Sequence, residues 1–442
     1  MKRTMNMKTN KKITPRSAAL DSLMAVERDS RYTNLEINAS LEKSGLSDAD
    51  RGLYTRLVYG VTERRITLDY IISQYSSKPA AELDADVLTA LRLGFYQLIY
   101  MDRIPDHAAV GETAGLVSGS KTGYVNAVLR SFLRASKKYK MPDGSDVTEY
   151  LSVKHSVPEA LVKLFGECVP EAELDDLLGA MNREPHVGLR VNTLKLTPEE
   201  AAEKTGGRIS DMAPDVVLTE SFDDAARCGV EEGLWFVQDT ASRVTSMALG
   251  AKSGETVVDT CACPGGKSFS AAMDMKNEGV LYSFDLHKNK LSLIAKGAEK
   301  LGISIITTEA RDARKPKEEL IGKADRVLCD APCSGLGVLA KKPDIRYKDL
   351  GDIERLPDIQ LAVLEGAAEY VKDGGVLVYS TCTLNIHENE EIVEKFLQRH
   401  SEFVLEKDAL LGGGMKTFYP HIDGCDGFFA AKMKKNGNNI KD

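Results

Sequence analysis

Two cysteines and an aspartate occupy positions where they could act together in catalysis. Residues 327–334, Val-Leu-Cys-Asp-Ala-Pro-Cys-Ser, form an apolar run that ends in the carboxylate of Asp330 and the thiol of Cys333. Residues 374–382, Gly-Gly-Val-Leu-Val-Tyr-Ser-Thr-Cys, repeat the arrangement and end in Cys382. In an open α/β sheet, reactive groups gather at the carboxyl ends of parallel strands. Cysteine is also a common buried residue, but two thiols at neighbouring strand ends predict a thiol-based active site.

A glycine-containing loop lies upstream of these strands. Glu-Thr-Val-Val-Asp (255–259) is expected to be a strand, and Thr-Cys-Ala-Cys-Pro-Gly-Gly-Lys (260–267) the loop after it. Gly265 and Gly266 lack Cβ atoms, so a ligand can approach the backbone closely, and the following helix offers unpaired amide donors. A phosphate-binding P-loop would need another glycine five residues before Gly266, where this sequence has Cys261. An ATPase site is therefore disfavoured.

Two acids follow the next two expected strands. The run Val280–Asp285 ends in Asp285, about 20 residues after the loop, where its carboxylate could accept hydrogen bonds from both ribose hydroxyls. The run Ile303–Thr308 leads towards Asp312, which could accept a hydrogen bond from an adenine amino group. A glycine loop and two acids at successive strand ends indicate an adenosine-bearing ligand.

Composition indicates a globular protein of two or three domains, since the chain has 442 residues, 43% of them hydrophobic and 28% charged. No apolar run is long enough to span a bilayer, and the basic, polar start does not resemble a signal peptide. Eight scattered cysteines suit a reducing compartment, and their spacing does not suggest a metal site. We expect a cytoplasmic protein with no membrane partner and no metal.

Hydrophobic periodicity predicts three regions. Residues 1–140 show apolar positions at helical spacing throughout and are expected to form an all-helical bundle. Residues 146–250 mix helical and strand-like patterns and are expected to form a small α+β subdomain. Residues 251–435 alternate strands, loops and helices, which predicts a doubly wound parallel α/β domain.

Charge is distributed unevenly between these regions. Residues 1–140 carry 22 Lys and Arg against 15 Asp and Glu, whereas the remaining 302 residues carry 36 against 51. A basic helical region on an acidic body suggests a polyanionic partner such as RNA. The candidate phosphate-facing side chains are Arg64, Arg65, Lys121, Arg130 and Arg134.

Three segments resemble signature motifs of the S-adenosylmethionine-dependent RNA cytosine carbon-5 methyltransferases, namely Asp259–Lys267, Asp330–Gly335 and Ser380–Thr383. The likeness continues through Glu388-Asn389-Glu390 and Asp426-Gly427-Phe428-Phe429. The N-terminal helices resemble the NusB-like RNA-binding module. Within this family, that module marks the Sun/RsmB branch, which acts on small-subunit ribosomal RNA.

The resemblance implies a Rossmann-like class I methyltransferase domain that uses S-adenosylmethionine, yields S-adenosylhomocysteine and needs no metal. It implies that the substrate is a cytosine of 16S ribosomal RNA, either unassembled or in an early assembly intermediate. The sequence does not determine the oligomeric state, and a monomer is favoured. It makes Cys382 the nucleophile and Cys333 the group that helps to release the product. The implied cofactor contacts are Cys261, Ala262, Cys263, Pro264, Gly265, Gly266, Lys267, Asp285, Asp312 and Asp330.

The chemistry of cytosine is consistent with two thiols. Carbon 5 becomes nucleophilic enough to take a methyl group only after a thiolate has added to carbon 6, and a base must later remove the carbon-5 proton. DNA cytosine methyltransferases use the Pro-Cys thiol as nucleophile, so the residues alone do not decide between Cys333 and Cys382. The alternative function is an RNA-binding ribosome-assembly or antitermination-type factor with an inactive methyltransferase domain. Measured methyl transfer would separate the two.

Overall fold

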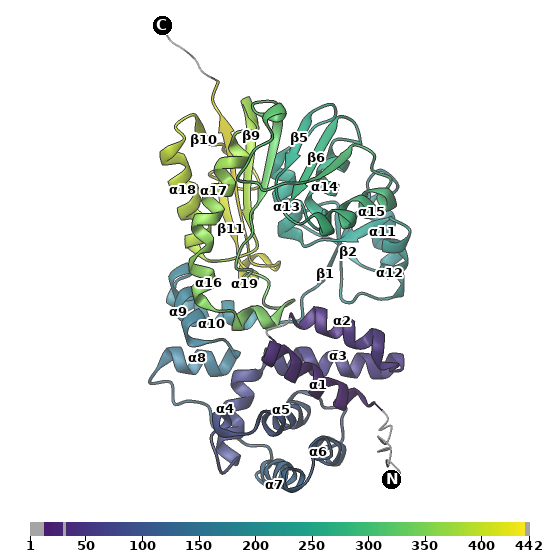
Figure 1. Cartoon of the computed structure of the whole chain (residues 1–442), viewed down its shortest axis with the longest axis vertical. Helices are drawn as coiled ribbons and strands as arrows, with labels where there is room; N and C mark the ends of the chain where they lie inside the picture. Colours follow the sequence, from purple (N-terminus) through teal and green to yellow (C-terminus); the bar gives the residue numbers. More distant parts are fainter. Residues whose placement is uncertain (1–12, 30–31, 438–442) are drawn as a thin grey trace, which may run out of the picture. The chain divides into compact units, whose positions relative to one another are not determined.

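The computed structural model describes residues 13–29 and 32–437, and their packing divides the chain into two units. The helical unit comprises the described residues up to Lys163 together with 342–347. The sheet unit comprises 164–341 and the described residues from Lys348 onwards. Figure 1 labels their helices and strands.

The helical unit is built from short helices joined by tight connections. They are α1 (Pro15–Asp29), α2 (Thr33–Ser44), α3 (Asp48–Glu63), α4 (Arg65–Tyr75), η1 (Ala80–Glu82), α5 (Ala85–Tyr100), α6 (Asp106–Ala114), α7 (Ser120–Arg134), α8 (Val147–His155) and η4 (Pro343–Tyr347), with α9 (Glu159–Cys168) running across the division into the sheet unit.

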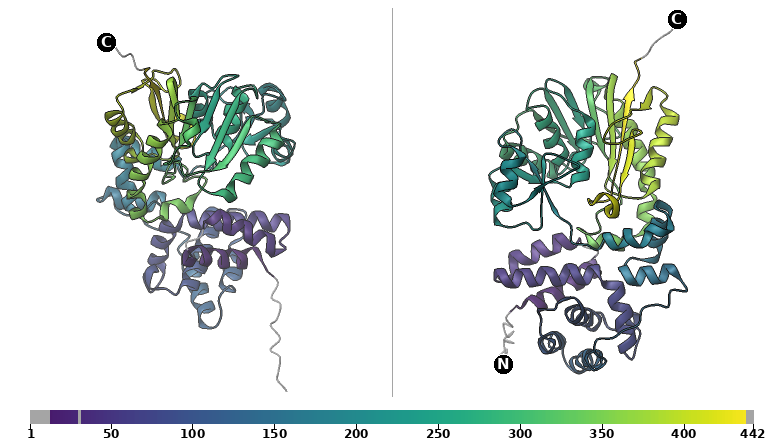
Figure 2. Two further views of the ribbon diagram at one scale, coloured as in Figure 1. Left: turned by 45° about the horizontal axis from the view of Figure 1, so that its top comes forward. Right: turned by 180° about the vertical axis from the view of Figure 1, so that it is seen from behind.

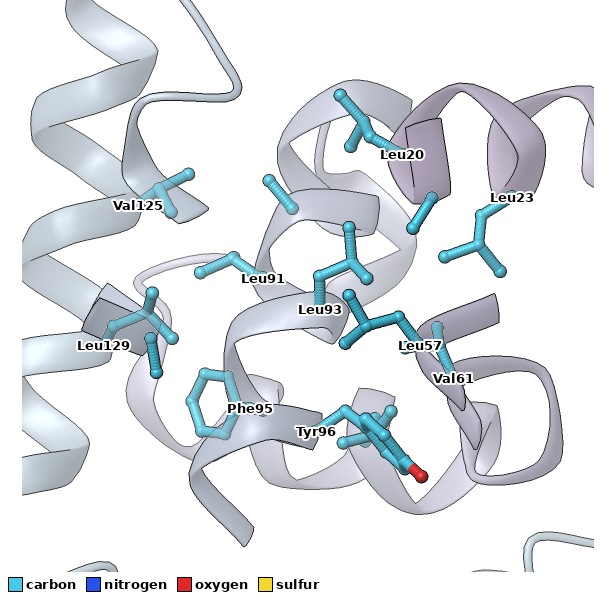
Figure 3. Packing of buried hydrophobic residues seen from close by; sticks show 14 of the residues in the cluster. Leu20, Leu23, Leu57, Val61, Leu91, Leu93, Phe95, Tyr96, Val125 and Leu129 are labelled. Carbon is cyan, nitrogen blue, oxygen red and sulfur yellow. The ribbon is translucent and has the colours of Figure 1, made fainter. Parts of the chain in front are cut away.

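The apolar stripes predicted for this region form one buried core. Leu57 and Val61 of α3, Leu91 and Phe95 of α5 and Leu129 of α7 are at most 2% exposed, and their side chains point into a common interior (Figure 3). Removing such side chains from water is the main force that holds amphipathic helices together. The predicted all-helical fold of this region is confirmed.

A four-stranded antiparallel sheet opens the sheet unit. Its strand order is β2-β3-β1-β4. The elements of this part are α10 (Glu171–Ala180), β1 (Val187–Val191), α11 (Pro198–Thr205), β2 (Arg208–Ile209), β3 (Val216–Thr219), α12 (Asp224–Glu231), β4 (Trp235–Val237) and α13 (Thr240–Leu249). A capping box begins α11, since Thr197 and Glu200 bond each other's backbone amides.

The large sheet has eight strands in the order β10-β12-β9-β8-β5-β6-β7, with β11 paired to β12. Its strands are β5 (Thr256–Asp259), β6 (Val280–Asp285), β7 (Ile306–Ala310), β8 (Ala324–Asp330), β9 (Val371–Thr381), β10 (Phe403–Leu405), β11 (Met415–Phe418) and β12 (Phe428–Lys435). Its helices are α14 (Gly266–Asp274), η2 (Lys288–Lys290), α15 (Leu291–Leu301), η3 (Glu318–Leu320), α16 (Leu350–Glu354), α17 (Leu356–Ala368), η5 (Ile386–Glu388), α18 (Glu390–Arg399) and α19 (Pro420–Asp423).

Helices cover both faces of this sheet, as expected of a doubly wound domain (Figures 1 and 2). Consecutive residues of β5 show this directly, because side chains alternate between faces along a strand. Val257 packs in the cluster that contains residues of α14 and α15, whereas Val258 packs in the cluster that contains residues of α17 and α18. The predicted Rossmann-like fold is confirmed.

The sheet is mixed rather than wholly parallel. Strands β7, β6, β5, β8 and β9 are parallel as predicted, but β12 runs antiparallel to β9, and β10 and β11 pair antiparallel with β12. The order reverses at β5, which has β6 on one side and β8 on the other. Ligands of open α/β sheets bind beyond the carboxyl ends of the strands at such a reversal.

Candidate active site

The loop after β5 lies at this reversal point. Its backbone is anchored to β6, because Ala262 N–H donates to the Phe284 carbonyl at 2.8 Å. Gly265 then takes a φ of +115°, and a Cβ atom there would lie 2.5 Å from the Phe269 ring. Helix α14 begins at Gly266, and its N-cap residue, Gly265, has no side chain that could cap it, so backbone amides of its first turn are available to an anion or polar ligand.

The two acids predicted to contact an adenosine lie at the ends of β6 and β7. The carboxylate of Asp285 is half-buried and accepts a hydrogen bond of 3.3 Å from Cys263 N–H, which ties the acid to the loop. Asp312 follows β7 and pairs with Arg314 at 2.8 Å. The hydrogen bond from Arg314 lowers the pKa of Asp312 to about 2, so this carboxylate is ionised at neutral pH.

Asp330 pairs with Lys267 at a distance of 2.7 Å between the carboxylate and the ammonium group. Its other oxygen accepts a hydrogen bond of 2.7 Å from Ser380 Oγ. The ammonium group also lies 4.8 Å from the centre of the Phe428 ring, within cation–π range. The Asp330–Lys267 pair therefore presents an acceptor and a donor side by side at the end of β8.

The two predicted catalytic thiols meet beyond the same edge. Asp330 and Ser380 are register partners of the parallel strands β8 and β9, so the residues just after them emerge together. Cys333 Sγ lies 3.2 Å from Cys382 Sγ, and Cys382 N–H donates to Cys333 Sγ at 3.3 Å. Neither cysteine forms a disulfide within the described part of the chain, and both are half-buried. The hydrogen bond with Cys382, followed by burial, raises the pKa of Cys333 well above the usual value, so Cys333 is a thiol at neutral pH.

The remaining cysteines near the loop have environments that suppress ionisation. Burial raises the pKa of Cys263 to about 12, and burial also raises the pKa of Cys261 and of Cys329. Thiolates, not thiols, act as nucleophiles. Over the described ranges, no three His, Cys, Asp or Glu side chains gather in a way that could hold a metal ion. Over the same ranges, no helix is both long and apolar enough to cross a membrane.

Sequence reasoning missed three features of this site. It placed both Lys267 and Asp330 among the cofactor contacts without pairing them, and the ammonium group of Lys267 bonds Asp330, 63 positions away. It gave no role to Ser380 or Phe428, although both stand inside quoted motifs, which is the signal that could have found them. Of the predicted phosphate-facing residues, Lys121 is engaged by Asp84 and Asp86, and the Arg65 guanidinium stacks 3.5 Å from the centre of the Tyr347 ring.

Chemically, the arrangement combines four functions at one sheet edge. Two thiols in contact can divide nucleophilic attack and proton transfer between them. The Asp330–Lys267 pair can bond the polar edge of a heterocycle, and the glycine loop with Asp285 and Asp312 forms a series of polar groups along the strand ends. Such an arrangement fits the transfer of a group to a heterocyclic ring.

Comparison with known proteins identifies relatives over nearly the whole chain. Residues 246–434 match the model of the 16S rRNA methyltransferase RsmB/F family, and residues 13–134 match the NusB family. A probable ribosomal RNA small subunit methyltransferase B of Bacillus subtilis is 38% identical, over 97% of this chain and all of that protein. The protein of the same description from Synechocystis is 35% identical, over 96% of this chain and all of that protein. The crystal structure of PH0851 covers 96% of this chain and 99% of its own, with 28% identity and a TM-score of 0.76. With this similarity over nearly its full length, the chain belongs to the RsmB/F family of 16S rRNA methyltransferases.

Proposed function

We propose that this methyltransferase transfers a methyl group from S-adenosylmethionine to carbon 5 of a cytosine in 16S ribosomal RNA. The observation that carries the proposal is the contact of 3.2 Å between Cys333 and Cys382, beside the Asp330–Lys267 pair. Methylation of an exocyclic amine or a ribose hydroxyl needs no thiol. Two thiols in contact match the particular requirement of carbon 5, which must first be activated by addition at carbon 6.

Cys382 is the nucleophile in this proposal. Its thiolate would bond to carbon 6, and electron density would move to carbon 5. Carbon 5 would bond to the methyl group as the bond between that methyl group and the sulfonium sulfur of S-adenosylmethionine breaks, so that S-adenosylhomocysteine is the leaving group. Cys333 then removes the carbon-5 proton, the bond between Cys382 and carbon 6 breaks, and the ring double bond returns. The raised pKa of Cys333 supports this division, because the thiol that stays protonated is the poorer candidate for the first attack.

Asp330 and Lys267 would bind the ring that Cys382 attacks. A carboxylate can accept a hydrogen bond from the exocyclic amine of cytosine, and an ammonium group can donate to the ring carbonyl oxygen. The neighbouring Phe428 ring offers an apolar surface beside them. A paired target base must also be unstacked before a thiol can reach its face, at a cost of a few kcal/mol.

The cofactor fits the glycine loop and the acids that follow it. Bound S-adenosylmethionine supplies an electrophilic methyl group on a sulfonium sulfur. The loop Cys261–Lys267 would hold it, since Gly265 lets the backbone take a path that a Cβ against the Phe269 ring would block, and the first turn of α14 has backbone amides. Asp285 would bind the ribose hydroxyls and Asp312 the adenine amino group. Asp330 lies at the same strand ends and would border this ligand.

Ribosomal RNA would be recognised by the NusB-like helical unit in addition to the active site. The basic charge of residues 1–140 suits a phosphate backbone. We expect an unassembled RNA or an early assembly intermediate as substrate, because base extrusion is easier before the RNA is fully packed. We also expect the enzyme to act as a monomer.

RNA that carries 5-fluorocytosine tests the covalent step, because its carbon-5 fluorine cannot leave as a proton does. The wild-type protein with S-adenosylmethionine should form a covalent RNA adduct that survives denaturing electrophoresis, and Cys382→Ala should form none. On ordinary RNA, Cys333→Ala should accumulate adduct. Cys228→Ala is the matched control, since this cysteine is exposed. The reverse behaviour of the two variants would exchange the roles, and RNA binding without any methyl transfer would favour an assembly factor.

A further inference from the structure

Ser334, the residue that follows Cys333, is held at each of its three polar groups. Its N–H donates to Glu388 Oε2 at 2.8 Å, its carbonyl accepts from Lys348 Nζ at 2.9 Å, and its hydroxyl bonds Thr383 Oγ1 at 2.8 Å. Because Thr383 follows Cys382, the hydroxyl contact ties the two cysteine-bearing turns together. The position of Cys333 therefore depends on what holds Ser334.

Glu388 is the buried member of this set. Its side chain is fully excluded from solvent (0% exposed), and both oxygens accept hydrogen bonds. Oε2 accepts from Ser334 N–H and from Gln360 Nε2 at 2.8 Å each, and Oε1 accepts from Asn385 Nδ2 at 3.0 Å. All three partners are donors, which suits the acceptor-only carboxylate form. Among the residues that the structure describes, no basic side chain forms an ion pair with Glu388, so its charge is balanced by amide dipoles alone.

This charge acts on the adjacent thiol. The pKa of Cys333 is raised first by the hydrogen bond with Cys382 and by burial, and also by the negative charge of Glu388. Other titratable or charged groups near Cys333 are Tyr379, whose own pKa is raised by burial, and Lys348, whose ammonium group bonds the Ser334 carbonyl. The Asp330–Lys267 pair also lies near, three residues before Cys333 on the Asp330 side, and its two charges oppose each other. Two thiols in contact do not both ionise readily, because the second negative charge is repelled by the first. A fixed charge that disfavours the Cys333 thiolate therefore favours Cys382 as the thiol that ionises.

We propose that Glu388 is a positioning residue that gives the two thiols their different roles. It holds the Cys333 turn through Ser334 N–H, and its buried charge keeps Cys333 protonated while Cys382 carries the reacting negative charge. Once Cys382 has bonded to carbon 6, it is a neutral thioether and no longer repels a charge on Cys333. Cys333 can then release its proton to water and take the proton from carbon 5. The proposal rests on the function proposed above and names the residue that orders its steps.

Two variants separate position from charge. Glu388→Gln removes the charge and sets an amide N–H₂ group against N–H donors, whereas Glu388→Asp keeps the charge but withdraws the carboxylate from Ser334 N–H. Glu394→Gln, on the exposed side of α18, is the matched control. The first measurement is alkylation of Cys333 by iodoacetamide across pH, followed by mass spectrometry of the full-length protein. It reports the thiolate fraction without any turnover.

We expect the thiolate fraction of Cys333 at pH 8 to rise about tenfold in Glu388→Gln, which corresponds to about 1.4 kcal/mol. It should stay unchanged in Glu388→Asp and in the control. In single-turnover assays on ordinary RNA, Glu388→Gln should form the Cys382 adduct about tenfold more slowly, because Cys382 then carries less of the negative charge of the pair. Glu388→Asp, which releases the Cys333 turn, should accumulate covalent adduct and lose roughly 10²-fold in product release. The affinity of both variants for S-adenosylhomocysteine should stay within about twofold of wild type.

Unchanged alkylation of Cys333 in Glu388→Gln, together with a normal rate of adduct formation, would overturn the proposal. If Glu388→Gln fails to fold, the proposal is tested by Glu388→Asp alone. Normal turnover in that variant would show that the hydrogen bond from Ser334 N–H to Glu388 is not needed, and would overturn the proposal. Failure of the proposed function looks different. In that case the wild-type protein itself would form no adduct with 5-fluorocytosine RNA, while the alkylation difference between Glu388→Gln and wild type could still be measured.

Discussion

The ammonium group of Lys267, in the first turn of α14, lies 2.7 Å from the carboxylate of Asp330 at the end of β8. The pair joins two motifs that are 63 residues apart, and both side chains are partly shielded from water, with exposed fractions of 11% for Lys267 and 30% for Asp330. In the proposed mechanism, both partners bond the target ring, and each holds the other in place.

Removing the ammonium group should therefore impair methyl transfer. Lys267→Met keeps the length of the side chain but deletes the donor, and we expect a loss of roughly 10²-fold in single-turnover methylation of 16S rRNA. Stability should change little, since Asp330 also keeps its bond to Ser380. Lys290→Met, an exposed residue near the loop, is the control. A normal rate in Lys267→Met would exclude this side chain from ring recognition.

Asp259 predicts a specific dependence of stability on pH. Burial raises its pKa to about 7 in the folded protein, although Ser268 donates a hydrogen bond of 2.7 Å to it. An unfolded chain ionises aspartate near 3.9. Between these values the folded state binds the extra proton, so this group stabilises the fold below about pH 4, and that contribution is lost as pH rises towards 7.

Asp259→Asn should flatten this profile, because the amide does not titrate. Urea unfolding at pH 5 and pH 8 should show that wild type loses about 2 kcal/mol more stability than the variant over this interval. Asp358→Asn, which replaces an exposed carboxylate on α17, should follow wild type. Equal slopes for wild type and Asp259→Asn would mean that Asp259 is ionised in the folded protein over the whole interval.

The strand-end positions were predictable from the sequence. Apolar runs that end in Asp285 or Asp330 identify the carboxyl ends of buried strands, and the topology of open α/β sheets brings such ends together. The structure accordingly places Cys333 and Cys382 in contact. These predictions depend only on local sequence, namely an apolar run and the polar residue that ends it. They lead to the correct contact because β8 and β9 are neighbouring parallel strands whose ends are in register.

Pairings between distant segments were not predictable in the same way. β12 reads Phe-Phe-Ala-Ala-Lys-Met-Lys-Lys, and nothing in that run says that it pairs antiparallel with β9 and completes the sheet. The hydrogen bond from Lys267 to Asp330 and the hydrogen bond from Ser334 N–H to Glu388 depend on which loops fold over the strand ends. Such contacts join residues more than 50 positions apart, which no periodic pattern encodes.

A buried charge network gives a further prediction. Asp215 and Asp274 both accept bonds from Arg243, with shortest distances of 2.7 Å, and Arg190 lies 3.1 Å from Asp215. Both arginines are buried, and burial lowers the pKa of Arg190 to about 10. The network joins residues from β1, the turn before β3, α13 and α14, so it ties the small sheet to the helices of the large one.

Deleting one carboxylate should leave two buried guanidinium groups with a single counterion. Asp274→Ala should lower the free energy of unfolding by about 3 kcal/mol, because an uncompensated buried charge is costly. The control is Asp211→Ala, because the Asp211 side chain is fully exposed and its pair with Arg208 is loose, at 3.9 Å. This variant should change the free energy of unfolding by less than about 0.5 kcal/mol. Urea denaturation followed by far-UV circular dichroism measures both. If Asp274→Ala and Asp211→Ala unfold with the same free energy, the buried network contributes no more to stability than a surface ion pair does.

The glycine loop can be tested through the backbone itself. Gly265 has a φ of +115°, which side chains with a Cβ rarely adopt, and a Cβ atom there would lie 2.5 Å from the Phe269 ring. Gly265→Ala must therefore move either the loop or that ring, which packs in the core between the sheet and α14.

We expect Gly265→Ala to lower the affinity for S-adenosylhomocysteine at least tenfold in isothermal titration calorimetry, because the loop that would hold it can no longer take its native path. Strain of this kind costs about 1–3 kcal/mol, so the melting temperature should also fall by several degrees. Gly413→Ala is the control, since a Cβ there has open space and no strained φ. A variant that melts earlier but binds with native affinity would assign Gly265 to stability alone, and the ligand would then have to lie away from this loop.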